Sequence, residues 1–213
     1  MKKIFREPAS GLSHFAAALL SAAALFALLY TAINNGDAWE IVSFSIFGVS
    51  MLLLYAASAA YHLFNGSEKL VRVLRKIDHS MIFVLIAGTY TPVCLTLLRG
   101  ATGYVLLSVV WACAIAGIAV KMFFFDMPRS LCTGIYITMG WAAVCAVVPL
   151  YRAAGAQALL WLLAGGALYT TGGVIYALKR PNLIPSWLGF HEIFHFFVIL
   201  GSASHFFMII KFC

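Results

Sequence analysis

Three histidines and one aspartate are the residues of this chain whose types and spacing are best suited to chemistry. His62 ends the run Ser58-Ala-Ala-Tyr-His62, and a second pair frames His191-Glu-Ile-Phe-His195. Asp78 begins a further apolar stretch. Ionisable groups inside apolar segments usually face a protein interior and have partners there. Because three protein ligands leave one position of a tetrahedral Zn²⁺ open, the pattern predicts a zinc site on His62, His191 and His195.

Charge suggests the roles of the remaining polar groups. Neutral imidazoles leave the double positive charge of the metal uncompensated, so Asp78 is predicted to accept a hydrogen bond from the metal-bound water. Such a water can become a nucleophile near neutral pH. Ser58 is placed to hydrogen-bond a ligand histidine, that water or a substrate carbonyl. The simpler alternative is that these groups hydrogen-bond across helices and only hold the bundle together.

The elements that position these residues are membrane helices. The 213 residues are 63% hydrophobic and 10% charged, whereas soluble domains are about 45–50% apolar and about 25% charged. A membrane span needs about 20 apolar residues, which divides the chain roughly into 12–33, 41–63, 78–98, 102–121, 130–150, 157–178 and 188–210. We therefore expect an all-α, polytopic membrane protein whose residues 1–213 form a single seven-transmembrane-helix bundle.

The distribution of basic residues predicts the orientation of this bundle. The net charge is +7, and its placement indicates a membrane topology rather than a nucleic-acid partner. The segments on one side contain Lys2, Lys3, Arg6, Lys69, Arg72, Arg75, Lys76, Lys121, Arg129, Lys179 and Arg180. Those on the other side contain Arg99, Arg152 and Lys211. The positive-inside rule then places the N-terminus in the cytoplasm and the C-terminus outside, in the cell membrane.

This orientation brings the four candidate site residues to one depth. His62 would end the second span, Asp78 would begin the third, and His191 and His195 would lie in the first turns of the seventh. Residues four apart share a helix face, which pairs Ser58 with His62 and His191 with His195. A zinc site in the cytoplasmic half of the membrane follows.

A protease motif competes with this interpretation. The run from His191 to His195 reads H-E-x-x-H, in which the glutamate would be the general base of a metalloprotease. A third ligand would normally follow along the chain. His205 is the available candidate, but it lies ten residues beyond His195 on the same helix, about 15 Å away.

Three blocks of this sequence resemble the hemolysin III family, the bacterial branch of the progestin and adipoQ receptor superfamily. They are Ser58-Ala-Ala-Tyr-His62, Asp78-His-Ser-Met-Ile-Phe-Val-Leu-Ile-Ala-Gly-Thr-Tyr-Thr-Pro92, and His191-Glu-Ile-Phe-His195 with Gly201-Ser-Ala-Ser-His205-Phe. The resemblance implies seven helices, a cytoplasmic N-terminus and Zn²⁺ on His62, His191 and His195. It also implies that Asp78 contacts the metal through water and that Ser58 lies beside the site.

The N-terminal block departs from the family pattern. It keeps Glu7 and His14 but has no asparagine between them, so we assign neither residue a role. One alternative places His14 in the wall of the cavity, but we expect His14 and His79 to be interfacial histidines.

Three functions are compatible with these residues. The first is a zinc-dependent, ceramidase-like hydrolase of a lipid amide or ester, with Asp78 and Ser58 as catalytic residues. The second is a non-enzymatic sensor in membrane lipid homeostasis, in which zinc is structural and the cavity holds a fatty chain. The third is the pore-forming cytolysin that the family name suggests, although a pore would need a polar stripe through the outer leaflet.

Overall fold

The predicted all-α class is confirmed for the part of the chain that the structure describes. This computed structural model describes residues 5–124, 127–184 and 188–213, and these ranges contain no β-strand. Lys2 and Lys3, which contribute to the expected charge bias, lie outside the described residues. The elements are α1 (Pro8–Asn35), α2 (Ala38–Leu63), α3 (Glu68–Leu95), α4 (Ala101–Phe123), α5 (Arg129–Gly140), a 3₁₀ segment η1 (Trp141–Ala146), α6 (Val147–Leu178) and α7 (Phe190–Phe212).

Local sequence signals account for where several helices begin. Pro8 is the first residue of α1, where its missing N–H loses no hydrogen bond. The Asp37 side chain caps α2 by accepting from the backbone N–H of Trp39 at 2.7 Å. Ser67 caps α3 in the same way, accepting from the backbone N–H of Leu70 at 3.3 Å. These caps satisfy backbone donors that a helix start leaves unpaired.

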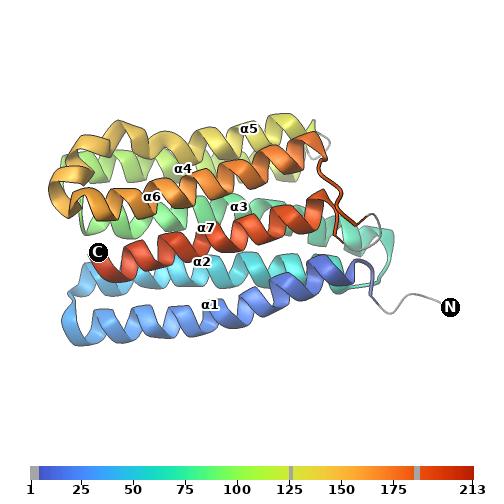
Figure 1. Cartoon of the computed structure of the whole chain (residues 1–213), viewed down its shortest axis with the longest axis horizontal. Coiled ribbons are helices and arrows are strands. Elements are labelled where there is room, and N and C mark those ends of the chain that lie inside the picture. Colours follow the sequence, from blue (N-terminus) through green and yellow to red (C-terminus); the bar gives the residue numbers. More distant parts are fainter. Residues whose placement is uncertain (1–4, 125–126, 185–187) are drawn as a thin grey trace.

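The helices lie side by side in one bundle, and its two ends differ (Figure 1). The start of α1 and the C-terminus lie at opposite ends. The end of α2, the start of α3 and the start of α7 all lie at the same end as the start of α1. The topology therefore gathers the segments that carry His62, Asp78 and His191 at one end of the molecule.

A sharp reversal divides α6. Gly155 has φ 76° and ψ −179°, which is not helical. The residues before it continue from α5 and η1, and those after it run back along the bundle (Figure 1). The expected spans 130–150 and 157–178 fall on these two antiparallel arms.

The bundle exposes large apolar side chains, and its interior contains buried polar side chains beside an apolar core, which is the arrangement expected in lipid. On α1, Phe26 is 73% exposed and Leu20 67%, whereas His14 is 3% exposed and Ser21 4%. In water, so much exposed hydrocarbon would be unfavourable. Among the described residues, five helical stretches are long and apolar enough to cross a membrane: Pro8–Asn35, Ala38–Leu63, Ala101–Phe123, Arg129–Leu178 and Phe190–Phe212. The chain is therefore an integral membrane protein.

Candidate metal centre

The three predicted histidines meet at one point of the bundle. His62 lies in the last turn of α2, and His191 and His195 lie in the first turns of α7, one above the other. One ring nitrogen from each lies within 4.8 Å of the others. His62 Nε2 and His191 Nε2 are 3.2 Å apart. His62 and His195 are buried and His191 is partly buried, so the cluster belongs to the bundle interior.

The start of α1 holds two of these rings by their other nitrogen. His62 Nδ1 donates to Glu7 Oε2 at 2.5 Å, and His195 Nδ1 lies 3.2 Å from the backbone oxygen of Ser10. A proton on Nδ1 leaves Nε2 with its lone pair available. Histidines that bind metals usually donate their second N–H to a carboxylate or a carbonyl in this way. The donor set and its supports therefore fit a zinc ion.

Glu7 is the charged partner of this arrangement. The hydrogen bond from His62 is the main influence that keeps the pKa of the Glu7 carboxyl below its ordinary value, against the opposing effect of partial burial. The nearby Arg6 guanidinium, 3.6 Å from Glu7 Oε1, acts in the same direction as His62. Glu7 is therefore an ionised acceptor for the imidazole N–H at neutral pH.

Asp78 and Ser58 lie beside the three histidines. Ser58 is buried, and its hydroxyl interacts with the Asp78 carboxylate. Asp78 Oδ2 is also 3.1 Å from His79 Nδ1. Ser58, Asp78, His191 and His195 all line one cavity. The structure thus brings the five predicted site residues to one region, with the three histidines as the inner group.

His14 is a member of this site, and it lines the cavity as the less favoured alternative placed it. The expectation that it is interfacial is wrong: its ring is buried and stacks on His195 with centroids 3.6 Å apart and planes at 11°. The same helix face buries Ser10 and Ser21. That polar stripe, spaced by four and seven residues, is the signal that would have placed His14 inside. The expected interfacial His79 is partly buried and pairs with Asp78.

Glu192 has a structural position that does not suit the protease interpretation. Its Oε1 accepts from Ser10 Oγ at 2.7 Å, and its Oε2 accepts from the backbone N–H of Gly189 at 2.9 Å. It therefore caps α7 and connects that helix to α1. Among the described residues, Glu192 is absent from the cavity wall and His205 from the histidine cluster. The H-E-x-x-H spacing here reflects a helix cap next to two clustered histidines.

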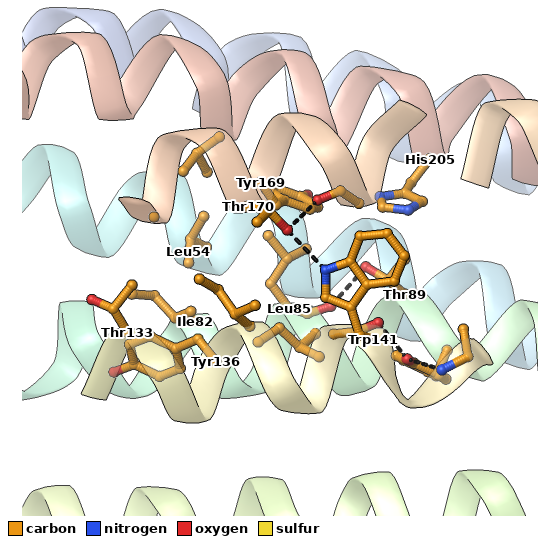
Figure 2. Close-up of a pocket in the computed structure, with 18 of the residues that line it drawn as sticks. Leu54, Ile82, Leu85, Thr89, Thr133, Tyr136, Trp141, Tyr169, Thr170 and His205 are labelled. Atoms are coloured by element: carbon orange, nitrogen blue, oxygen red, sulfur yellow. Dashed lines mark hydrogen bonds between the residues drawn. The ribbon is translucent and has the colours of Figure 1, made fainter. Parts of the chain in front are cut away.

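A cavity of about 230 Å³ extends from the histidines into the bundle. Its wall is mainly hydrocarbon and includes Leu54, Ile82 and Leu85 (Figure 2). Ile82, Leu85 and Thr89 follow Asp78 on one face of α3, as helical phase predicts. Farther along, the wall includes Trp141 and His205 (Figure 2). The cavity therefore joins the polar groups at the histidine end to a mainly apolar wall.

The sequence of this chain is similar to one family model and to several known proteins. A family model described as "Haemolysin-III related" matches residues 2–206. The "Hemolysin-3 homolog" of Bacillus subtilis is 44% identical over 213 residues, covering 100% of this chain and 97% of the relative. "Hemolysin-3" of Bacillus cereus is 40% identical, covering 96% and 90%. The "Adiponectin receptor protein" of Drosophila melanogaster is 27% identical over 187 residues, covering 78% of this chain and 41% of the relative.

Proposed function

The chain belongs to the haemolysin III family, and from that premise we propose that it is a zinc-dependent hydrolase of a membrane-lipid amide or ester. It is a multi-pass protein of the cell membrane. The observation that carries the proposal is the meeting of His62, His191 and His195 at one end of a hydrocarbon-lined cavity.

The proposed topology is a single domain, 1–213, of seven spans with the N-terminus inside and the C-terminus outside. The five apolar stretches become seven spans in two steps. We add α3 as a span, and we count Arg129–Leu178 as two spans because the chain reverses at Gly155. An odd number of crossings agrees with the opposite positions of the start of α1 and the C-terminus (Figure 1). The excess of basic residues near the histidine end supports its placement in the cytoplasm.

The proposed zinc ligands are His62, His191 and His195. Zn²⁺ bound there supplies Lewis acidity, which polarises a carbonyl and acidifies water. The chain does the rest of the chemistry. Asp78 accepts a proton from the attacking water at a carboxylate oxygen. It returns that proton to the leaving amine nitrogen or alkoxide oxygen as the C–N or C–O bond breaks, and the Ser58 hydroxyl orients the carboxylate.

The cavity determines which molecules reach these groups. A fatty chain occupies the hydrocarbon-lined space while its amide or ester carbonyl lies beside the histidines. The site lies near the end of the bundle, at the depth where head groups join acyl chains. A lipid that enters sideways between helices meets the site without leaving the membrane.

Metal content tests the zinc site. Purified wild-type protein is expected to contain about one zinc per chain by inductively coupled plasma mass spectrometry. His62→Ala and His191→Ala are expected to lose it, because each removes one of three ligands. His205→Phe is the matched control, since it removes a buried histidine of α7 outside the cluster. Metal-free wild-type protein, purified without chelators, would refute the zinc site.

Lipid turnover tests the reaction. Asp78→Asn is expected to reduce turnover about 10²–10⁴-fold because it removes the proton acceptor. Ser58→Ala is expected to reduce it less, and both variants keep their zinc. Wild-type protein that holds intact lipid and zinc without turnover would instead support the sensor, in which zinc joins α2 to α7.

The names of the Bacillus relatives also suggest a cytolytic pore. The cavity gives that function no support, because its wall is mainly hydrocarbon rather than a polar stripe.

A further inference from the structure

A basic groove lies on the surface at the histidine end of the bundle. Its volume is about 490 Å³. Its wall carries Arg72, Arg75 and Lys76 together with Glu68 and the rings of Tyr61 and Phe123. We use the term basic groove for the surface formed by Arg72, Arg75 and Lys76. Three cations and one carboxylate give the described part of this wall a positive charge.

The first turns of α3 produce this groove. Arg72 lies three and four residues before Arg75 and Lys76, so the three side chains share one helix face. The neighbouring faces expose Leu70, Val73 and Ile77. Basic side chains near the end of a membrane-spanning helix extend to the membrane interface. This part of α3 thus presents its cations at head-group level.

Contacts between α3 and the end of α4 form one side of the groove. Lys76 Nζ donates to the backbone oxygen of Met122 at 2.7 Å, next to Phe123 at the end of α4. The Tyr61 ring also lines the groove and is covered by Arg6, whose Cζ is 4.0 Å from the ring centroid. The groove therefore lies between the end of α2, the start of α3 and the end of α4.

Arg75 connects this groove to the proposed reaction site. It lines the groove and also the cavity that contains Asp78 and His191. Asp78 lies three positions after Arg75 in the sequence, which is about 4.5 Å along the helix axis. One molecule can therefore contact the groove and the histidine cluster together.

The chemistry that this surface recognises is a phosphate ester. Arginine and lysine donate charge-assisted hydrogen bonds to phosphate oxygens, and arginine does so through two parallel N–H groups. Clusters of such residues beside a membrane helix bind anionic lipid head groups. In a glycerophospholipid, about five bonds separate the phosphorus from an ester carbonyl, or about 6 Å at about 1.2 Å per bond. Because Arg75 lines both the groove and the cavity, one lipid of this kind can place its phosphate in the groove and its ester in the cavity.

We propose that the basic groove is the head-group site of an anionic glycerophospholipid whose ester and acyl chain enter the cavity past Arg75. This inference rests on the proposed lipid function and names its ligand class. Arg72, Arg75 and Lys76 then determine specificity, while the linkage lies beside Asp78 and the three histidines.

Lipid titration followed by native mass spectrometry tests the proposal on the full-length protein in detergent. The probes are phosphatidylglycerol and phosphatidylcholine with identical acyl chains, and zinc content is measured on the same samples. Wild-type protein is expected to bind the first phosphatidylglycerol about fivefold more tightly or better, since each basic residue near the head group contributes about that factor. Glycerol 3-phosphate, which has no acyl chain, is expected not to compete at the same concentrations.

Single charge-neutralising variants locate the site. Arg72→Gln and Arg75→Gln are each expected to reduce the preference for phosphatidylglycerol about fivefold while zinc content stays unchanged. Lys69→Gln is the matched control, because it removes the same charge from the same helix but Lys69 does not line the groove. Its preference is expected to equal that of the wild type.

The outcomes separate this proposal from the proposed function. Equal binding of the two lipids by a zinc-containing wild type overturns the head-group site alone. The head-group site is also overturned if Lys69→Gln loses as much preference for phosphatidylglycerol as the groove variants do, because bulk surface charge would then explain the preference. If glycerol 3-phosphate competes effectively, the lipid proposal is overturned, because the groove then binds a free phosphate ester. Wild-type protein that binds neither lipid and no zinc overturns the proposed function itself.

Discussion

At the scale of single residues, the candidate metal centre depends as much on α1 as on the histidines themselves. Glu7 and the backbone of Ser10 hold the rings of His62 and His195 by Nδ1. His14 stacks on one face of the His195 ring. These contacts orient the rings in advance of metal binding, and preorganised ligands bind metals more tightly.

Glu7→Gln is expected to weaken zinc binding about 10- to 100-fold, because the amide is a poorer acceptor for the His62 N–H than the carboxylate. Competition with a chromophoric chelator measures the change. Ser10→Ala is the control: it removes the hydrogen bond to Glu192 but keeps the carbonyl that supports His195. If the two variants bind zinc equally well, Glu7 has no such supporting role.

The stacked ring of His14 leads to a second prediction. His14→Ala is expected to lower the free energy of unfolding by about 2 kcal/mol or more, because it leaves a cavity beside His195. His14→Phe keeps an aromatic ring on His195 and is expected to restore most of that stability. Both variants should keep their zinc, since His14 is not in the three-histidine cluster. Thermal unfolding and metal content check this, and loss of zinc in His14→Phe would contradict it.

At the scale of elements, a single glycine determines how residues 129–178 are arranged. Gly155 has φ 76° with ψ −179°, a conformation that is essentially restricted to glycine. Without that reversal, Arg129–Leu178 would continue as one helical stretch. Its two arms pack against other helices and carry the cavity-lining residues Tyr136 and Tyr169 (Figure 2).

Gly155→Ala is therefore expected to destabilise the fold by about 1–3 kcal/mol, the typical cost of a strained backbone conformation. Gly134→Ala is the matched control because Gly134 is helical and has open space where its Cβ would lie. That control should be neutral or stabilising by up to about 1 kcal/mol. Thermal unfolding in detergent compares the two, and equal melting temperatures would show that no strain arises at residue 155.

At the scale of the whole molecule, the topology places the histidines, the basic groove and the start of α1 at one end of the bundle. All three therefore lie on the same side of the membrane, and the orientation of the bundle decides which side that is. If that end faces the cytoplasm, anionic lipids of the inner leaflet lie next to the groove.

Cysteine accessibility measures this orientation. In a background without the five native cysteines, Asn35→Cys at the end of α1 is expected to react with a membrane-impermeant maleimide on intact cells. Lys69→Cys at the start of α3 should react only after the cells are lysed. The reverse pattern would show that the histidine end faces outward, and it would remove the basis for a cytoplasmic site.

The sequence alone determined the class of this protein and the end of the bundle at which its candidate site residues meet. Composition indicated membrane helices, and the periodicity of each helix indicated which face of α2, α3 and α7 turns inward. Those properties are local, because a helix in lipid satisfies its own backbone and exposes apolar side chains whatever its neighbours are. For this reason the pattern of residues is sufficient to single out His62, Asp78, His191 and His195.

Tertiary structure decided which partners these residues have. The contact between Glu7 and His62 joins residues 55 positions apart, and that between Ser10 and Glu192 joins residues 182 positions apart. The chain contains several carboxylates and histidines with similar spacing, so pattern alone could not select Glu7 and His14 or assign Glu192 to a helix cap. Such choices arise from the packing of α1 against α2 and α7, since contacts between distant segments exist only after the helices have assembled.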